Sequence, residues 1–381
     1  MFRSNRLAAL LAVALLGSAA CAVPTGSSGP PASPAPAAAS TPLAAAPTAT
    51  VTATPVASPA PVAIKDGEPW IVYSQGGQTD SAGVEGTGIL MVRPDGPEPH
   101  EFLNIRAEHP DWSPDGKRIA IVAEPAADIS EIWTVNADGT DAKKLIACVE
   151  APCVGFAGPA WSPDGKQLAF MRYLQPATKG YEDDQIAIEV LDLATGSTRV
   201  VAKSPVVVDS KYVEYVLPRW SPDGKQIVFA VATYPTPPTD ENILASSIAV
   251  VRADGSEVDA PRILTDPALF GAYPDWSPDG QRIVFNTYPI GSFQDTTKAQ
   301  NLYTIRPDGT GLTQVTHFGE NDTRAAEPTW TPDGKRIIFM HIAPDPNDPW
   351  GVRRIALVDA DGSNLNVPGW FGQHPRLRPT P

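Results

Sequence analysis

The feature that most constrains this 381-residue chain is a motif that occurs five times. Each copy reads Pro-x-Trp-Ser/Thr-Pro-Asp-Gly and continues into an alternating apolar stretch, as in PDWSPDGKRIAIV from Pro110. The five tryptophans are Trp112, Trp161, Trp220, Trp276 and Trp330, at spacings of 49, 59, 56 and 54 residues. Periods of this length are typical of solenoids and propellers, so the repeat decides the fold class before any single residue does.

Each repeat predicts a small antiparallel sheet. The Ser-Pro-Asp-Gly segment predicts a tight turn, because Pro fixes φ and Gly accepts the positive φ that other residues avoid. The stretch after the turn alternates, as Ile119 and Ile121 do, so one face of that strand is apolar. A second apolar stretch ends in an Asp-Gly hairpin signal, as in IWTVNADGT from Ile132. Sheets of about four strands bury both faces when they are arranged radially in a β-propeller.

The two ends of the chain supply one further unit between them. Residues 66–73 align with residues 115–122, so the domain begins after the first strand of a unit. Residues 374–379 align with residues 109–114, so the chain ends with a first strand that nothing follows. We therefore expect an all-β, six-bladed β-propeller in which the C-terminal strand closes the ring beside the N-terminal strands and removes the free sheet edges.

These repeats resemble the TolB-type, WD40-like propeller family, whose WSPDGK units also occur in the propellers of prolyl-oligopeptidase-like enzymes. The resemblance covers residues 64–381 and rests on the turn chemistry of all five copies. It implies a six-bladed fold and an interaction role in the cell envelope. The chain departs from TolB in one large respect, because a linker stands where TolB has a separate α/β domain ahead of its propeller.

The first 20 residues predict a secretory signal peptide. Arg3 and Arg6 precede an apolar run at 7–16, which is too short for a confident membrane span and is followed by small residues. The segment 18–21 (SAAC) resembles a bacterial lipobox, with Ser18 where that motif usually has Leu. We expect lipid attachment at Cys21; the alternative is ordinary cleavage that leaves Cys21 as a spare thiol.

Residues 21–63 predict a disordered linker behind the lipidated Cys21, and residues 64–381 the propeller. Ten of the 42 prolines lie in residues 22–63, which contain no charged or aromatic residue and therefore favour an extended tether. The propeller holds all 43 acidic and 27 of the 29 basic residues, a net charge of −16. This balance argues against nucleic acid as a partner, because phosphate binding needs clustered Lys and Arg.

The sequence contains no catalytic motif that we can identify. The G-x-S-x-G and H-E-x-x-H patterns and the phosphate-binding glycine loops are absent. We therefore predict that the chain is not an enzyme but a monomeric, membrane-anchored binding or scaffold propeller. Its expected partner is an envelope protein, a peptide or a glycan, on the periplasmic or extracellular face. The alternatives are a metal-assisted hydrolase or lyase that uses the propeller channel, and a purely structural surface protein.

The position three residues before each repeat tryptophan should face the channel mouth. It holds His109, Gly158, Leu217, Tyr273 and Glu327, with His374 at the matching place of the closing strand. Because His109, Glu327 and His374 fall on consecutive blades, they could bind zinc or another divalent ion. We favour a solvated polar mouth with a Glu–His hydrogen bond and no cofactor, because the ring can hold these groups too far apart for joint ligation.

The residue directly before each tryptophan also differs from blade to blade, with Asp111, Arg219 and Asp275 among the charged ones and Arg376 in the closing strand. The candidate binding residues at the channel mouth are therefore His109, Tyr273, Glu327, His374, Asp111, Arg219 and Asp275. Three insertions, at 173–184, 234–242 and 288–300, are either a further binding surface or ordinary loop growth.

A pair of cysteines lies close together between the second and third repeats. Cys148 and Cys153 stand in the segment Cys-Val-Glu-Ala-Pro-Cys. In an exported protein this spacing predicts a local disulfide that stiffens the loop, and the alternative is two reduced thiols.

Overall fold

The computed structural model describes residues 63–379, with gaps at 66, 80–84, 97–98, 104, 127–128, 176–184, 206–210, 236–242, 288–298, 321–322 and 346–347. The predicted signal peptide and lipid site, at 1–20 and Cys21, and the predicted linker up to residue 62 lie outside the described residues. Over the described part of the chain, no helix has the length and apolarity that crossing a membrane requires.

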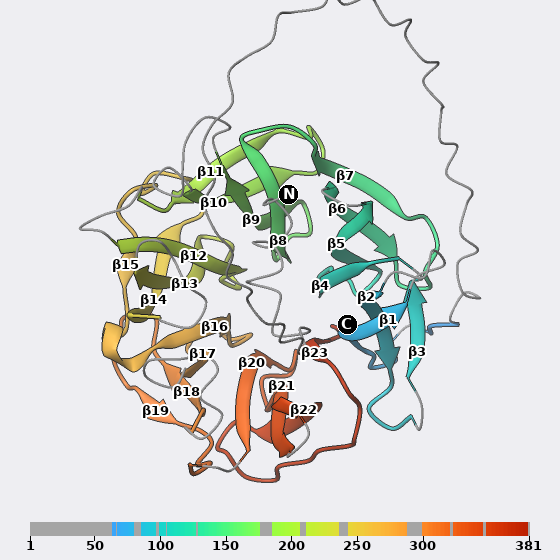
Figure 1. The fold of residues 1–381 in the computed structure, drawn as a ribbon, viewed down its shortest axis with the longest axis vertical. Coiled ribbons are helices and arrows are strands. Elements are labelled where there is room, and N and C mark those ends of the chain that lie inside the picture. The colour runs from blue at the N-terminus through green and yellow to red at the C-terminus, as the bar shows by residue number, and fades with distance from the viewer. Residues whose placement is uncertain are drawn as a thin grey trace, which may run out of the picture.

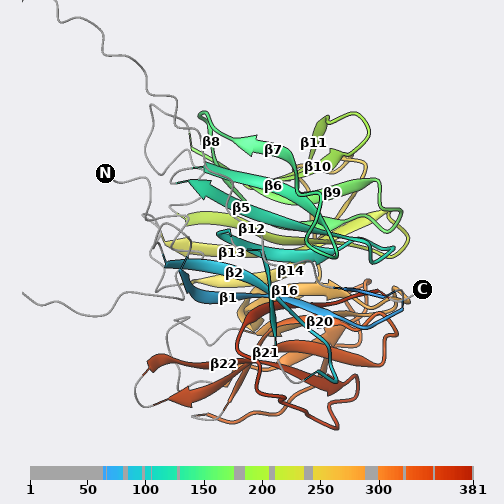
Figure 2. The ribbon, with the colours of Figure 1, turned by 90° about the vertical axis from the view of Figure 1, so that its right-hand side faces the viewer.

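Six antiparallel sheets form a ring, which confirms the predicted all-β, six-bladed propeller (Figure 1). The strands lie along the direction of the ring axis, as the view turned by 90° shows (Figure 2). We number the sheets as blades I to VI, starting from the one that contains the strand nearest the N-terminus.

The first three blades have four strands each, in the sheet orders β23-β1-β2-β3, β4-β5-β6-β7 and β8-β9-β10-β11. Blade I consists of β23 (Gln373–Leu377), β1 (Ile71–Thr79), β2 (Glu85–Val92) and β3 (His100–Leu103). Blade II consists of β4 (Ala107–Trp112), β5 (Arg118–Ala126), β6 (Ile129–Asn136) and β7 (Lys143–Cys148). Blade III consists of β8 (Cys153–Trp161), β9 (Gln167–Leu174), β10 (Gln185–Asp192) and β11 (Thr198–Lys203).

The other three blades follow the same order along the chain. Blade IV consists of β12 (Lys211–Trp220), β13 (Gln226–Pro235), β14 (Ala245–Arg252) and β15 (Arg262–Ile263), and the short 3-10 helix η2 (Pro267–Leu269) follows it. Blade V consists of β16 (Gly271–Trp276), β17 (Ile283–Thr287), β18 (Leu302–Ile305) and β19 (Thr313–Gln314). Blade VI consists of β20 (Arg324–Trp330), β21 (Arg336–Asp345) and β22 (Asp348–Asp359).

The Ser-Pro-Asp-Gly turns explain why the motif repeats. In blade II, Ser113 Oγ donates to Asp115 Oδ1 at 2.6 Å and accepts from the backbone N–H of Arg118 at 2.9 Å. Gly116, at φ 64°, supplies the left-handed conformation that the turn requires. The same hydroxyl–carboxylate pair recurs in four further blades, as Ser162–Asp164, Ser221–Asp223, Ser277–Asp279 and Thr331–Asp333. Each turn is therefore fixed by its own side chains.

The core lies between neighbouring blades. The strands after the turns bury their apolar residues completely, as Ile119, Phe229 and Phe339 show. Two of the repeat tryptophans also tie their blade to the preceding one, because Trp112 Nε1 donates to the carbonyl of Arg376 and Trp220 Nε1 to that of Ala160, each at 3.2 Å. Burial of this apolar surface is the main source of stability in such a ring.

The C-terminal strand β23 closes the ring against β1, as the sequence predicts. The alignment of residues 66–73 with 115–122 is wrong by one residue at β1. Ile71 pairs with Leu377 in blade I, and Ile119 pairs with Trp112 in blade II. Ile71 therefore corresponds to Ile119, whereas the expected alignment matched it with Ala120. The segment before β1 therefore contains one more residue than the turns of the other blades. The correspondence of His374 with His109 and of Arg376 with Asp111 is unaffected.

Candidate functional site around the propeller axis

The six first strands of the blades surround the axis and share one backbone irregularity. Each pairs with its neighbour through a β-bulge, and the bulge residue has a left-handed φ in every blade. These residues are His109 (51°), Gly158 (56°), Leu217 (53°), Tyr273 (51°), Glu327 (55°) and His374 (53°). Five of the six are not glycine, although this conformation costs about 1–2 kcal/mol for such residues. The scaffold therefore enforces the bulge and places six different side chains at equivalent points.

The bulge lies within the first strand, but its distance from the beginning of the strand differs between blades: β23 begins only one residue before His374. Strand β12 begins at Lys211, six residues before Leu217. The side chains are buried: those of His109, Glu327 and His374 are only 9%, 8% and 12% exposed. In place of the expected solvated polar mouth, these three residues therefore form a buried layer inside the ring.

Three of the predicted residues meet in this layer, where blades VI, I and II come together. The rings of His109 and His374 have their centroids 4.2 Å apart. Glu327 Oε2 accepts from the backbone N–H of His374 at 2.7 Å, and Glu327 Oε1 lies 3.4 Å from His374 Nε2. The described residues contain no group of three or more His, Cys, Asp or Glu side chains arranged to hold a metal ion. The hypothesis of a metal site at His109, Glu327 and His374 stays a prediction.

Both histidines are neutral at ordinary pH. Burial lowers the pKa of His109 to about 3, and the positive charge of Arg219 acts in the same direction. Burial also lowers the pKa of His374 to about 3, although the charge of Glu327 opposes it. A neutral imidazole accepts a hydrogen bond at one nitrogen and donates at the other, so this pair can take part in polar contacts without carrying charge.

A second layer, formed by the residues before the tryptophans, joins neighbouring blades. Asp111 Oδ2 accepts from the backbone N–H of Trp161 at 2.9 Å, and Arg376 Nε lies 3.4 Å from Asp111 Oδ1. Asp275 Oδ2 accepts from Thr329 Oγ1 at 2.6 Å and from the backbone N–H of Trp330 at 2.9 Å. These two predicted binding residues therefore bond to the following blade.

Arg219 is the cation that the groups of this layer share. Burial raises the pKa of Asp111 and of Asp275 to about 6, and in both cases the positive charge of Arg219 opposes the shift. Arg219 itself is 8% exposed, and its Nη1 donates to the carbonyl of Pro218 at 3.0 Å. This second layer, formed by the residues before the tryptophans, thus contains buried acidic and basic groups together.

Sequence reasoning missed a cluster on the other side of the bulge, toward the beginning of the first strands. We call it the acidic–aromatic cluster; it consists of Glu108, Tyr173, Tyr212, Glu214, Tyr234 and Tyr273. Burial, followed by the charge of Glu214, raises the pKa of Tyr173 and of Tyr234 well above the usual value. The rings of Tyr212 and Tyr234 have centroids 6.5 Å apart. Of these residues, Tyr273 was among our candidates for the channel mouth, and Tyr173 and Tyr234 begin two of the insertions that we named as a possible binding surface.

Glu108 is a member of this cluster with an unsatisfied buried atom. It is 3% exposed, and its Oε1 accepts no hydrogen bond, although His109 Nδ1 lies 3.5 Å away. Burial raises the pKa of Glu108 to about 8, against the opposing charge of Arg106. A glutamate next to the bulge, at a place where the other blades carry Ala157, Val216, Ala272, Ala326 and Gln373, is the signal in the sequence that could have identified it.

Strands β9 and β13, which carry Tyr173 and Tyr234, lead into two of the three insertions singled out from the sequence. The inner parts of those insertions, 176–184, 236–242 and 288–298, lie outside the described residues. Their role in binding stays a prediction.

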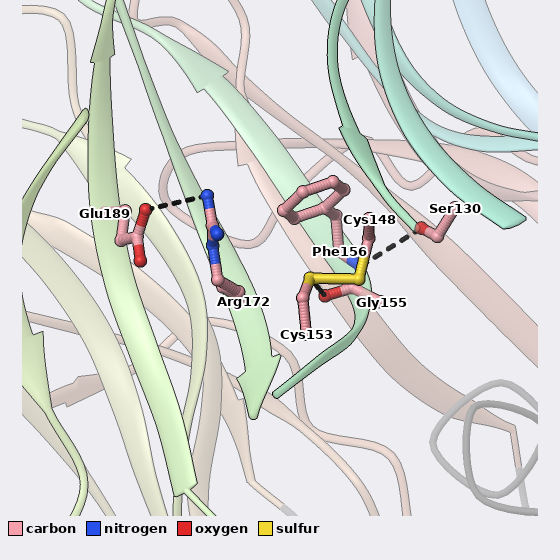
Figure 3. The surroundings of a disulfide bond; sticks show 7 residues. All are labelled: Ser130, Cys148, Cys153, Gly155, Phe156, Arg172 and Glu189. Atoms are coloured by element: carbon pink, nitrogen blue, oxygen red, sulfur yellow. Dashed lines mark hydrogen bonds and ion pairs between the residues drawn. A yellow bond between two sulfur atoms is a disulfide. The ribbon is translucent and has the colours of Figure 1, made fainter. Parts of the chain in front are cut away.

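The two cysteines between blades II and III form a disulfide in the structure, with an S–S distance of 2.05 Å (Figure 3). The bond connects the end of β7 to the start of β8. Nearby, the backbone N–H of Phe156 donates to Ser130 Oγ at 3.1 Å, and Arg172 lies over the ring of Phe156 while it pairs with Glu189 at 3.1 Å (Figure 3). The disulfide therefore belongs to the connection between two blades and is not part of the axial layers.

Comparison with known proteins agrees with this architecture. The family model described as the TolB beta propeller domain matches residues 156–367. The crystal structure of TolB from Acinetobacter baumannii is similar, with a TM-score of 0.57 and 18% identity over 82% of this chain and 67% of that one. The structure of putative TolB from Agrobacterium tumefaciens has a TM-score of 0.52 and 20% identity over 82% of this chain and 99% of that one. These two likenesses concern the fold.

A match among curated proteins corrects one expectation. The chain is 28% identical over 149 residues to a Bacillus subtilis (strain 168) protein named "Uncharacterized peptidase YuxL", which covers 32% of this chain and 21% of the relative. The chain thus spans about a fifth of the length of that relative. Because this relative is named a peptidase, our prediction that the chain is not an enzyme is contradicted, and we do not retain it.

Proposed function

The chain belongs to the TolB beta propeller domain family, and we propose that it is an exported, membrane-tethered propeller that binds a protein of the cell envelope at the acidic–aromatic cluster. Export and anchoring rest on the signal-like segment at 1–20 and on the lipobox-like Cys21. The segment 22–63, with its ten prolines, would hold the propeller away from the membrane surface.

The observation that carries the binding site is the buried, unsatisfied Oε1 of Glu108. A buried polar atom without a hydrogen bond costs about 1–3 kcal/mol, so a ligand that supplies a donor gains that free energy on binding. Glu214, 7% exposed, adds a second carboxyl group to the same cluster. A lysine or arginine side chain of a partner would provide the donor, and its positive charge would favour ionisation of the Glu108 carboxyl group on binding.

The aromatic members of the cluster support the same assignment. Tyrosines are favoured in binding surfaces, because they combine large contact area with a polar group. Tyr173 and Tyr273 are only partly buried and pack against the core shared by blades III and IV. They therefore offer apolar contact beside the two carboxyl groups. The net charge of −16 of the propeller favours a basic partner for the same reason.

Affinity purification from the producing bacterium tests the proposal. We would express the full-length tagged chain, solubilise the membranes in detergent, and identify the co-purified envelope proteins by mass spectrometry. The double variant Glu108→Gln/Glu214→Gln should recover at least tenfold less of the specific partner, whereas Glu101→Gln, an exposed glutamate on β3, should recover the wild-type amount. Equal recovery by the double variant would overturn the proposed site.

Anchoring has its own test. The mass of the mature protein should include a lipid on Cys21, and the variant Cys21→Ser should leave the membrane fraction. A wild-type protein that lacks the lipid and is found in the soluble fraction would contradict the tether.

A further inference from the structure

A cavity of about 360 Å³ lies between blades II and III, at the Ser-Pro-Asp-Gly turns. These turns follow the ends of β4 and β8, whereas Glu108 of the acidic–aromatic cluster lies near the beginning of β4. The residues that line the cavity include Arg118, Thr134 and Lys143 from blade II and Trp161 and Asp164 from blade III, together with Asp115. The two sites are therefore separate, and binding at this cavity is independent of the proposed function.

The corresponding place between blades V and VI is filled by the chain itself. Arg282, the last residue before β17, lies with its guanidinium carbon 4.7 Å from the ring centroid of Trp330, the tryptophan of the next blade. Arg118 and Trp161 are the equivalent residues at the blade II–III interface. Guanidinium groups over indole rings are attracted by the π system, so this is a favourable occupant of such a place.

Arg118 does not lie over Trp161. Its Nη2 donates to Thr134 Oγ1 at 2.9 Å and to the carbonyl of Asp141 at 3.4 Å, and its Nη1 lies 3.5 Å from Asp141 Oδ2. Among the described residues, no guanidinium occupies the space over Trp161. The cavity therefore exists because Arg118 turns toward the hairpin of its own blade.

Differences in the hairpin explain the two orientations: blade II has Asp141 and Asn136 where blade V has Gly311 and, packed against it, Arg306. The registers of β5 with β6 and of β17 with β18 make Thr134 of blade II equivalent to Thr304 of blade V. In the hairpins that follow, Asp141 of blade II is equivalent to Gly311 of blade V. Both positions have left-handed φ, 49° and 68°. Blade V thus retains the threonine but has no carboxylate there to hold its arginine, and Arg282 turns to the tryptophan. In blade II, the carboxylate of Asp141 attracts the guanidinium of Arg118, which therefore does not lie over Trp161.

The charges of the cavity suit a cation. Asp164 Oδ1 accepts from Ser162 Oγ at 2.6 Å and from the backbone N–H of Lys166 at 3.1 Å, and these bonds lower the pKa of its carboxyl group. Asp115 is held in the same way by Ser113 and Lys117. The charge of Arg118 is paired with Asp141, and Lys143 is exposed. Two fixed carboxylates therefore face the cavity beside the indole of Trp161.

We propose that this cavity binds the guanidinium group of an arginine side chain from a partner protein, over the ring of Trp161, in the place that Arg282 takes over Trp330. The partner's arginine would supply the guanidinium group that Arg282 of blade V supplies over Trp330. The carboxylates of Asp115 and Asp164 would compensate its charge.

The test uses the full chain and N-acetyl-L-arginine amide, followed through the indole N–H signal of Trp161 in a ¹⁵N-labelled sample and assigned with Trp161→Phe. We expect a saturable shift of this signal. N-acetyl-L-citrulline amide, which has the same shape without the charge, should bind at least tenfold more weakly. An equal response to both compounds, or no response at Trp161, would overturn the proposal.

The variant Asp141→Gly gives a second measurement that does not weaken the fold, because glycine suits the left-handed φ of this exposed position. It should release Arg118 to lie over Trp161, shift the indole signal in the absence of ligand, and weaken binding of the arginine amide at least tenfold. Asn364→Gly, at the equivalent left-handed position of blade VI, is the matched control and should bind as the wild type does. Undiminished binding by Asp141→Gly would sink the idea.

Discussion

The imidazole of His374, on the last strand of the chain, lies against that of His109, on the first strand of blade II, with ring centroids 4.2 Å apart. The two residues occupy the same bulge position of consecutive blades, 265 residues apart in sequence. Their contact therefore exists only when the ring is closed. Because burial keeps both rings neutral, the contact brings no charge repulsion until acid protonates them.

Acid should weaken the fold through this pair. Between about pH 6.5 and 3, the unfolded chain binds protons at His109 and His374 that the folded chain does not bind, so stability falls as pH falls. The variant His109→Gln/His374→Gln should lose this component, up to about 1.4 kcal/mol per pH unit for each histidine. Urea unfolding from pH 4 to 7 measures it, with the exposed His317→Gln as control. The same pH slope in wild type and double variant would contradict the buried, neutral state.

Glu108 should produce the opposite slope. Its pKa is raised to about 8, so between about pH 4.5 and 8 the folded chain keeps a proton that the unfolded chain has lost, and stability falls as pH rises. The variant Glu108→Gln has no carboxyl group here and should not show this decrease of stability with rising pH. Its stability relative to the wild type should increase with pH by at most about 1.4 kcal/mol per unit. A difference between the two proteins that stays constant from pH 5 to 8 would show that Glu108 is ionised throughout.

Local chemistry explains why the sequence predicts the fold well and the site only in part. The turn at Ser113, Asp115 and Gly116 is built from its own residues, so its repetition counts the blades directly. The equivalence of His109, Glu327 and His374 follows from the same repetition. Their burial comes with contacts between neighbouring blades, such as that of His109 with His374, which the repeat does not reveal. The direction of Arg118 is influenced by Asp141, 23 residues later in the hairpin of the same blade, and this side-chain pairing is not part of the repeated motif.

Closure of the ring should depend strongly on Arg378. This residue is 5% exposed, donates through Nε to the carbonyl of Gly116 at 2.8 Å and through Nη1 to the carbonyl of Lys65 at 2.8 Å, and lies over the ring of Trp112. Arg378→Ala removes the side-chain donor of the buried Gly116 carbonyl and one of the two donors of the Lys65 carbonyl, which also accepts from the backbone N–H of Glu68. It also removes the contact with Trp112, and should reduce the free energy of unfolding by about 2–4 kcal/mol.

Arg93→Ala is the control for Arg378, because Arg93 is 44% exposed and forms only a surface pair with Asp95. It should change stability by no more than about 1 kcal/mol. Chemical denaturation measures both variants. Equal effects of the two substitutions would mean that the contacts of Arg378 do not hold the closing strand in place.

Gly158 is the one glycine among the six bulge residues, and its neighbour on the next blade accounts for it. A Cβ at this position would lie 2.6 Å from Leu217 Cδ2, whereas five non-glycine residues tolerate the same left-handed φ in the other blades. Gly158→Ala should therefore destabilise the protein by about 1–3 kcal/mol, because the added methyl group overpacks the interface between blades III and IV. In a Leu217→Ala background the same substitution should cost at least about 0.5 kcal/mol less, since the clashing atom is gone. Gly196→Ala, which has φ 71° and no atom within 4 Å of its Cβ, measures the conformational cost alone by urea denaturation. Identical costs with and without Leu217 would show that backbone conformation, and not this contact, requires the glycine.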